Sequence, residues 1–118
     1  MTVPKPGTIV LLPDWEQYNL MQVLSLRTLR EFWERHPDAK TPLRVWYKIV
    51  TQARWKNFAE VTASFGTADA VGDKRIVFNI AGNRYRIVAR VVYGPFYRAM
   101  IKFVGTHREY DQINPETV

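Results

Sequence analysis

The chain has 118 residues, enough for one domain with a modest core, and its 47% hydrophobic content with four Trp, six Tyr and six Phe predicts a folded protein. It contains no cysteine, which excludes disulfide scaffolds, thiolate zinc sites and cysteine nucleophiles, and two histidines are too few for a histidine-rich metal site. The net charge is +6; residues 1–20 contribute one Lys against one Asp and one Glu, so the remainder carries +7.

Membrane segments are not expected. No apolar run approaches the roughly 18 residues that a membrane helix needs, and Ile9 to Leu12 is shorter than the roughly 7 to 15 residues of a signal-peptide core. We therefore expect a soluble, cytoplasmic protein without a membrane partner, a metal or another cofactor.

The first twenty residues differ from the rest of the chain. Pro4, Pro6, Gly7 and Pro13 interrupt them, and a regular pattern begins only at Met21. We interpret residues 1–20 as an N-terminal arm of unknown role and residues 21–118 as the folded domain.

The predicted domain begins with a short strand and an amphipathic helix. Residues 21–24 are the candidate strand, and Ser25 is a plausible N-cap for the helix. Apolar residues then recur at helical spacing up to His36 and Pro37, where the proline ends the pattern.

Two further helices follow. Thr41 followed by Pro42 is a typical helix start, and a second pair, Asn57 with Glu60, resembles a capping box. The expected buried stripes are Leu43, Trp46, Ile49, Val50 and Ala53 in one helix, and Phe58, Val61 and Phe65 in the other. Residues 66–73 are predicted to form a polar loop.

Residues 76–80, 85–93 and 96–104 read as an antiparallel meander, because they are rich in Val, Ile, Phe and Tyr and are separated by turn formers. Strict alternation predicts two faces for the sheet. The expected apolar face holds Tyr85, Ile87, Ala89, Val91, Tyr93, Tyr97, Ala99, Ile101 and Phe103, and the other face holds Arg84, Arg86, Val88, Arg90, Val92, Arg98, Met100, Lys102 and Val104.

Basic residues dominate this segment. Eight occur from residue 74 to residue 108 without one acidic residue: Lys74, Arg75, Arg84, Arg86, Arg90, Arg98, Lys102 and Arg108. Each could be an ordinary solvated position of a half-exposed sheet. Together they would give one sheet face charges of a single sign, which favours a phosphate backbone as the partner.

A short helical turn is predicted after the last strand, because Thr106 and Glu109 match a capping box. His107 would then occupy the first helical position, where phosphate is favoured, and could transfer protons. Tyr110 and Asp111 would share its face. The alternatives are that His107 is a surface or cap-packing residue and that Asp111 only orients its ring or compensates nearby arginines.

Several separated motifs closely resemble the HigB family, toxins of type II toxin-antitoxin systems within the RelE-like group. They are R-H-P-D-A-K-T-P-L, the segment Ala53 to Trp55, F-N-I-A-G-N-R-Y-R-I-V-A and T-H-R-E-Y-D, in the family's order, and the resemblance covers about residues 21–114. It implies a compact α+β RelE-like fold, in which N-terminal helices pack on a mainly antiparallel sheet followed by a short C-terminal helical turn.

The resemblance also implies a metal-independent mRNA endoribonuclease that acts on ribosome-bound message and is neutralised by a HigA-type helix-turn-helix antitoxin. Operator DNA would be bound only through the toxin-antitoxin complex. In an endoribonuclease of this kind we expect Arg86 and Lys102 to hold the scissile phosphate while His107 and Tyr110 handle protons or position the sugar. Candidates for binding the RNA backbone are Arg84, Arg75, Arg90 and Lys56. The alternative is a catalytically inactive module that binds RNA or the antitoxin.

Overall fold

A five-stranded sheet organises the protein, whose computed structural model describes residues 21–118. The strand order is β1-β5-β4-β3-β2, with β1 parallel to β5 and every other pair antiparallel. The strands are β1 (Gln22–Leu24), β2 (Asp69–Val71), β3 (Arg75–Ile80), β4 (Tyr85–Val92) and β5 (Arg98–Thr106). The expected α+β fold with a mainly antiparallel sheet is confirmed. The predicted N-terminal arm, residues 1–20, lies outside the described residues.

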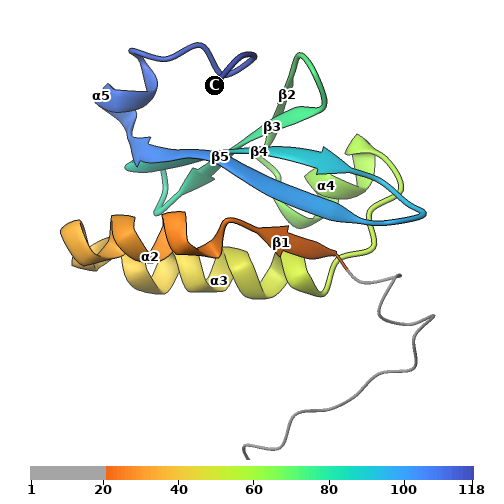
Figure 1. Ribbon diagram of the computed structural model, residues 1–118, viewed down its shortest axis with the longest axis horizontal. Helices are drawn as coiled ribbons and strands as arrows, with labels where there is room; N and C mark the ends of the chain where they lie inside the picture. Colours follow the sequence, from red (N-terminus) through yellow and green to blue (C-terminus); the bar gives the residue numbers. More distant parts are fainter. Residues whose placement is uncertain (1–20) are drawn as a thin grey trace, which may run out of the picture.

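The two longest helices lie along one face of this sheet, and the last helix with the C-terminal segment lies on the other side (Figure 1). The helices are α2 (Leu26–Arg35), the 3-10 turn η1 (Pro37–Ala39), α3 (Lys40–Thr51), α4 (Phe58–Ser64) and α5 (His107–Tyr110). Within residues 21–118 no helix is long and apolar enough to cross a membrane.

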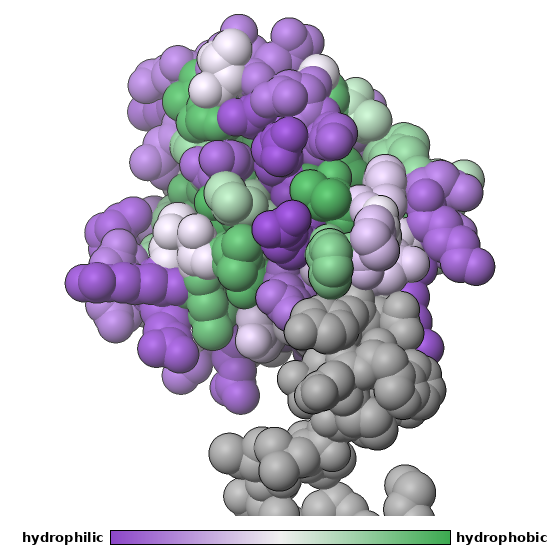
Figure 2. Space-filling view, turned by 45° about the vertical axis from the view of Figure 1, so that its right-hand side comes forward, coloured by the Kyte–Doolittle hydropathy of each residue, from purple (hydrophilic) through white to green (hydrophobic). Residues whose placement is uncertain are grey.

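The core lies between the helices and the inner face of the sheet. Phe78 on β3 meets the rings of Trp46, Trp55 and Phe65 at centroid distances of 5.1 to 6.4 Å. Tyr85 and Ile87 on β4 belong to the same buried cluster, so the predicted inner face of that strand is confirmed. Outside this core, hydrophobic residues are interspersed with hydrophilic ones on the face seen in Figure 2.

The cap predictions have mixed outcomes. The Asn57 side chain accepts a hydrogen bond from the Glu60 amide, and Thr106 with Glu109 forms a complete capping box, as predicted. Ser25 does precede α2, but its backbone is left-handed (φ 73°) and its side chain makes no cap hydrogen bond. The predicted start at Thr41 is wrong, because the 3-10 turn η1 leads directly into α3 at Lys40.

Two details of the helices and the loop also differ from expectation. Ile49 was expected to be buried but is 37% exposed, because the stripe that faces the sheet consists of Leu43, Trp46 and Val50. The predicted loop 66–73 contains the short edge strand β2, which pairs with β3. Residues 69 and 70 are exposed, so this strand carries little hydrophobic signal.

A β-bulge in β5 changes which residues reach each face. Ala89 pairs with Ile101, but its neighbour Val88 pairs with Phe103, so Lys102 is an extra residue without an opposite partner. Phe103 therefore lies on the outer face, while Val104 packs against the core. The predicted faces of these last two residues are wrong, because strict alternation fails at an inserted residue.

Candidate functional site

The candidate site lies on the outer face of the sheet, where the start of the central strand β4 meets α5. Arg86 on β4 pairs with Asn79 on β3 and with Gly105 on β5. Paired residues of neighbouring strands point to the same side of a sheet, so Arg86 and Asn79 share this face. The absence of a side chain at Gly105 leaves room for the ring of Phe103, which lies where a Cβ at position 105 would be.

The capping box fixes the start of α5 above this face. The Thr106 amide donates to the Glu109 carboxylate at 2.9 Å, and the Glu109 amide donates to the Thr106 hydroxyl at 3.1 Å. The backbone bond from Thr106 is the main reason that the pKa of Glu109 lies below its ordinary value. These bonds set the direction of the helix, and Tyr110 projects from its last position.

Tyr110 lies against two residues of the sheet. Its ring is 6.4 Å from that of Phe103, and the guanidinium carbon of Arg86 lies 4.8 Å from its centre, a cation-π contact. A nitrogen of Arg86, Nη2, also donates to Asn83 Oδ1 at 2.7 Å. The side chain of Arg86 is thus held from two sides.

A polar cavity of about 340 Å³ opens beside this pair. Its wall includes Arg86, Tyr110 and Asn79, together with the segment 66–69 that leads from α4 into β2. The Nε atom of Arg86 is buried, and no hydrogen-bond partner for it occurs among residues 21–118. A donor of this kind beside a polar cavity is suited to an anionic ligand such as phosphate.

His107 lies one turn before Tyr110 on the same side of α5. Its Nδ1 is 3.2 Å from a carboxylate oxygen of Asp111, an arrangement that fixes the orientation of the imidazole ring. The side chain is 44% exposed, so it is accessible to a ligand. It is not among the residues that line the cavity.

Lys102 lies at a distance along β5 from Gly105, the residue opposite Arg86. It is the bulge residue of β5, three positions before Gly105, which corresponds to about 10 Å along the strand. It is half-buried and does not line the cavity. The structure thus brings Arg86 and Tyr110 into contact, places His107 one turn before Tyr110 on α5, and leaves both His107 and Lys102 out of the cavity wall.

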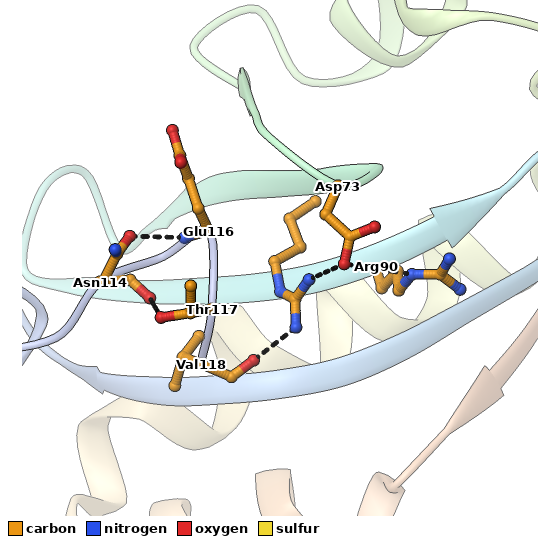
Figure 3. Close-up of polar contacts among 7 residues, drawn as sticks. Asp73, Arg90, Asn114, Glu116, Thr117 and Val118 are labelled. Carbon is orange, nitrogen blue, oxygen red and sulfur yellow. Dashed lines mark hydrogen bonds and ion pairs between the residues drawn. The ribbon is translucent and has the colours of Figure 1, made fainter.

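The four candidate RNA-binding residues occupy different environments. Arg75 is only 7% exposed, and its guanidinium donates to the carboxylate of Asp73 and to the main-chain oxygen of Val118 (Figure 3). This side chain anchors the C-terminal segment, and little of it is exposed for contact with RNA. Arg90 is partly exposed, with Nε 4.0 Å from Asp73, and Lys56 is exposed between α3 and α4.

Arg84 is directed toward the helical layer. Its Nη1 donates to Asp38 at 2.6 Å, and the Tyr85 hydroxyl donates to the other oxygen of the same carboxylate at 2.6 Å. The bonds from Tyr85 and Arg84 hold the pKa of Asp38 below its ordinary value, and the bond to Asp38 raises the pKa of Tyr85. Arg84 is still substantially exposed, but this bond ties it to η1 and away from Arg86.

Sequence reasoning missed Asn79, Asn83 and Asp38. The first two lie in the motif F-N-I-A-G-N, yet nothing in one strand alone indicates that Asn79 will lie beside Arg86; that requires the register of β3 on β4. Asp38 lies 46 residues before Arg84 in the chain, too far for a local pattern to reveal the pair. Among residues 21–118, no group of three or more His, Asp or Glu side chains gathers as a possible metal site.

Comparison with known proteins identifies the same family as the sequence motifs. The family described as "HigB_toxin, RelE-like toxic component of a toxin-antitoxin system" matches residues 39–113. The chain is 31% identical over 93 residues to "mRNA interferase toxin HigB" of Escherichia coli (strain K12), an alignment that covers 77% of this chain and 88% of that protein. The "mRNA interferase HigB" proteins of Escherichia coli O157:H7 and Shigella flexneri match to the same extent. The resemblance inferred from the sequence is confirmed, and the chain belongs to the HigB family of RelE-like toxins.

Proposed function

We propose that this toxin is an mRNA endoribonuclease whose reaction takes place at the cavity beside Arg86 and Tyr110. The observation that carries the proposal is the contact between these two side chains at the wall of a polar cavity on the outer face of the sheet. Its relatives are named mRNA interferases, which supports the same substrate for this chain.

The proposed reaction uses no metal. The ribose 2′-hydroxyl attacks the adjacent phosphorus, the bond from phosphorus to the 5′-oxygen breaks, and a cyclic phosphate and a free 5′-hydroxyl result. The protein must accept the proton of the attacking hydroxyl, stabilise the charge on the phosphate and donate a proton to the leaving oxygen. General acid-base assistance contributes about 10²- to 10⁴-fold in rate.

Arg86 is the group best suited to the phosphate. Its guanidinium is held by Tyr110 and Asn83, so little side-chain entropy remains to be lost when a phosphate binds, and its buried Nε donor would gain an acceptor. His107, oriented by Asp111, and the Tyr110 hydroxyl are the proposed proton-handling groups. Lys102 and Arg90 are proposed to attract the RNA strand along the same sheet, and Lys56 is a more remote candidate contact.

We further propose that the substrate is message on the ribosome in the cytoplasm, that a HigA-type helix-turn-helix antitoxin neutralises the toxin, and that operator DNA is bound only by their complex. The family description supports an antitoxin partner in general. A catalytically inactive module that binds RNA or the antitoxin through the same face is the alternative.

A defined translation reaction separates these possibilities. Purified protein, treated with a chelator and desalted before addition, should truncate the message when ribosomes are translating it, and should leave ribosome-free message largely intact. Intact message at saturating protein, with salt-dependent RNA binding retained, would favour the inactive module. Loss of cutting after the chelator treatment, with recovery on adding back a metal other than magnesium, would contradict the metal-independent reaction.

A further inference from the structure

The outer surface of the helical layer carries a groove that the proposed nuclease site does not use. It lies between α2 and α3 and has a volume of about 580 Å³. Its apolar walls include Leu26, Trp33, Val45 and Tyr47. Val45 is 51% exposed and Ile49, one turn further along α3, is 37% exposed, so this helix presents large aliphatic side chains to solvent. Exposed apolar surface around a groove is typical of a docking site.

The charges around the groove have one sign. Arg30, Arg44 and Lys48 line it, and no acidic residue does. A complementary occupant therefore carries carboxylates next to large apolar side chains.

One stretch of this chain outside the described residues has that composition. Residues 9–16 read I-V-L-L-P-D-W-E, four aliphatic residues and a tryptophan together with Asp14 and Glu16, and they contain no Lys or Arg. Since the groove offers apolar walls and a basic rim, the apolar residues match the walls and the two carboxylates match the rim.

The point where the described chain begins is close to the groove. The Met21 amide donates to the carbonyl oxygen of Ala53, just beyond the end of α3, and Thr51 at that end lines the groove. Eight residues lie between Leu12 and Met21, and the nine Cα-to-Cα steps of this tether span up to about 30 Å. The groove residues on α3 run from Thr41 to Thr51, about 15 Å of helix. The tether is long enough for residues 9–16 to reach any part of the groove.

We propose that residues 9–16 of this chain bind in the groove between α2 and α3 of the same molecule, with Ile9 to Leu12 and Trp15 against its apolar walls and Asp14 and Glu16 near Arg30, Arg44 and Lys48. The docked segment covers Val45. This intramolecular site is independent of the proposed nuclease reaction, because the groove and the RNA-facing cavity lie on opposite sides of the sheet.

Disulfide formation within the full chain tests the proposal, because the protein has no cysteine of its own. The variant L12C/V45C should form an intramolecular disulfide at least tenfold faster than the matched variant L12C/R98C under the same oxidant. Residue 98 is the matched control because it is exposed and pairs with Gln22, next to the start of the tether. Equal rates would mean that residue 12 samples both places without binding, and would overturn the proposal. Disulfides formed mainly between molecules would also overturn it and indicate that the groove binds a second copy.

Charge reversal tests the role of the basic rim. In the L12C/V45C background, the further changes Arg44→Glu and Lys48→Glu should slow disulfide formation several-fold. The control changes Arg27→Glu and Lys40→Glu, at exposed positions of the same helices that do not line the groove, should leave the rate unchanged. A rate insensitive to both pairs would overturn recognition of the acidic segment.

A measurement without cysteines completes the test. In the full chain, Leu11→Asp with Leu12→Asp should shift the NMR methyl signals of Val45 and Ile49, whereas Thr2→Asp should not. Unchanged signals in the double variant would overturn the proposal even if the disulfides formed.

Discussion

The guanidinium carbon of Arg86 lies 4.8 Å from the centre of the Tyr110 ring, and this contact joins the central strand of the sheet to the C-terminal helix. It combines a cation suited to phosphate with an aromatic hydroxyl that can take part in proton transfer. The capping box, the Asn83 side chain and the ring of Phe103 hold the pair in place.

Arg86→Ala should reduce cleavage of translated message by about 10²-fold, because a positioned charge donor to the phosphate contributes about that much. Arg86→Lys should recover only part of the rate, since an ammonium group cannot reproduce the planar guanidinium. The measurement is the rate of message truncation in a defined translation reaction. Arg27→Ala is the control, because this highly exposed arginine lies on α2, in the helical layer. Similar losses for Arg86→Ala and Arg27→Ala would contradict the site assignment.

Tyr110→Phe should retain the ring and its contact with Arg86 while removing the hydroxyl. If the hydroxyl handles a proton or binds the sugar, cleavage should fall at least tenfold with the melting temperature unchanged. Tyr110→Ala should cost more, because Arg86 then loses its aromatic support. Wild-type cleavage by Tyr110→Phe would assign the residue a purely positioning role. His107→Ala, assayed in parallel, should also lose at least tenfold, and normal cutting by this folded variant would remove His107 from the mechanism.

Thr106→Ala should destabilise α5 by about 1 kcal/mol, the usual cost of losing an N-cap side chain. Amide hydrogen exchange at residues 107–110 should accelerate about fivefold, which is the same free energy expressed as an equilibrium constant. Cleavage should fall because both His107 and Tyr110 depend on this helix. Thr106→Ser keeps the hydroxyl and should leave exchange nearly unchanged. Fast exchange in the serine variant would show that the cap hydrogen bond is not what holds the helix.

Gly105→Ala should displace the ring of Phe103, since a ring atom of Phe103 lies too close to the position of the new Cβ for both to fit. Overpacking of this kind costs about 1 to 3 kcal/mol. The free energy of unfolding, measured with denaturant, should fall by that amount, and cleavage should fall because Phe103 packs against Tyr110. The control is Gly66→Ala, where nothing lies within 4 Å of the new Cβ, so unfolding should change little. Equal stability of the two variants would contradict the close contact.

The bonds of Asp38 predict a pH-dependent contribution to stability. Hydrogen bonds from Tyr85 and Arg84 lower the pKa of Asp38 from its ordinary value of 3.8, so the folded state favours the charged carboxylate. This contribution is present above pH 3.8 and disappears as the pH falls through the lowered pKa of the folded protein. Asp38→Asn should therefore lower the melting temperature at pH 7, and the difference from wild type should shrink toward pH 2. A difference independent of pH would mean that the charge of Asp38 does not matter.

Much of the fold follows from local pattern, but the candidate site does not. Alternating apolar residues located β3, β4 and β5, and helical spacing located α2 and α3. Three features needed information from outside their own segment. The edge strand β2 is too short and polar to recognise from its sequence. Asp38 and Arg84 come into contact only when the chain folds, and the contact of Arg86 with Tyr110 depends on the register of two strands. The basic character of the sheet could be predicted, whereas the burial of Arg75 against Asp73 and Val118 could not.

The bulge at Lys102 determines which face of the sheet each later residue of β5 occupies. In a regular strand of the same sequence, without the bulge, Phe103 would turn inward opposite Ile87, Val104 would turn outward, and the position opposite Arg86 would pass from Gly105 to Val104. Tyr110 would then lose the ring it packs against, although the amino-acid sequence would be the same. Insertions between residues 101 and 104 should therefore be far less tolerated than substitutions there, and an alignment of relatives that slips by one position in this strand would exchange core residues for site residues.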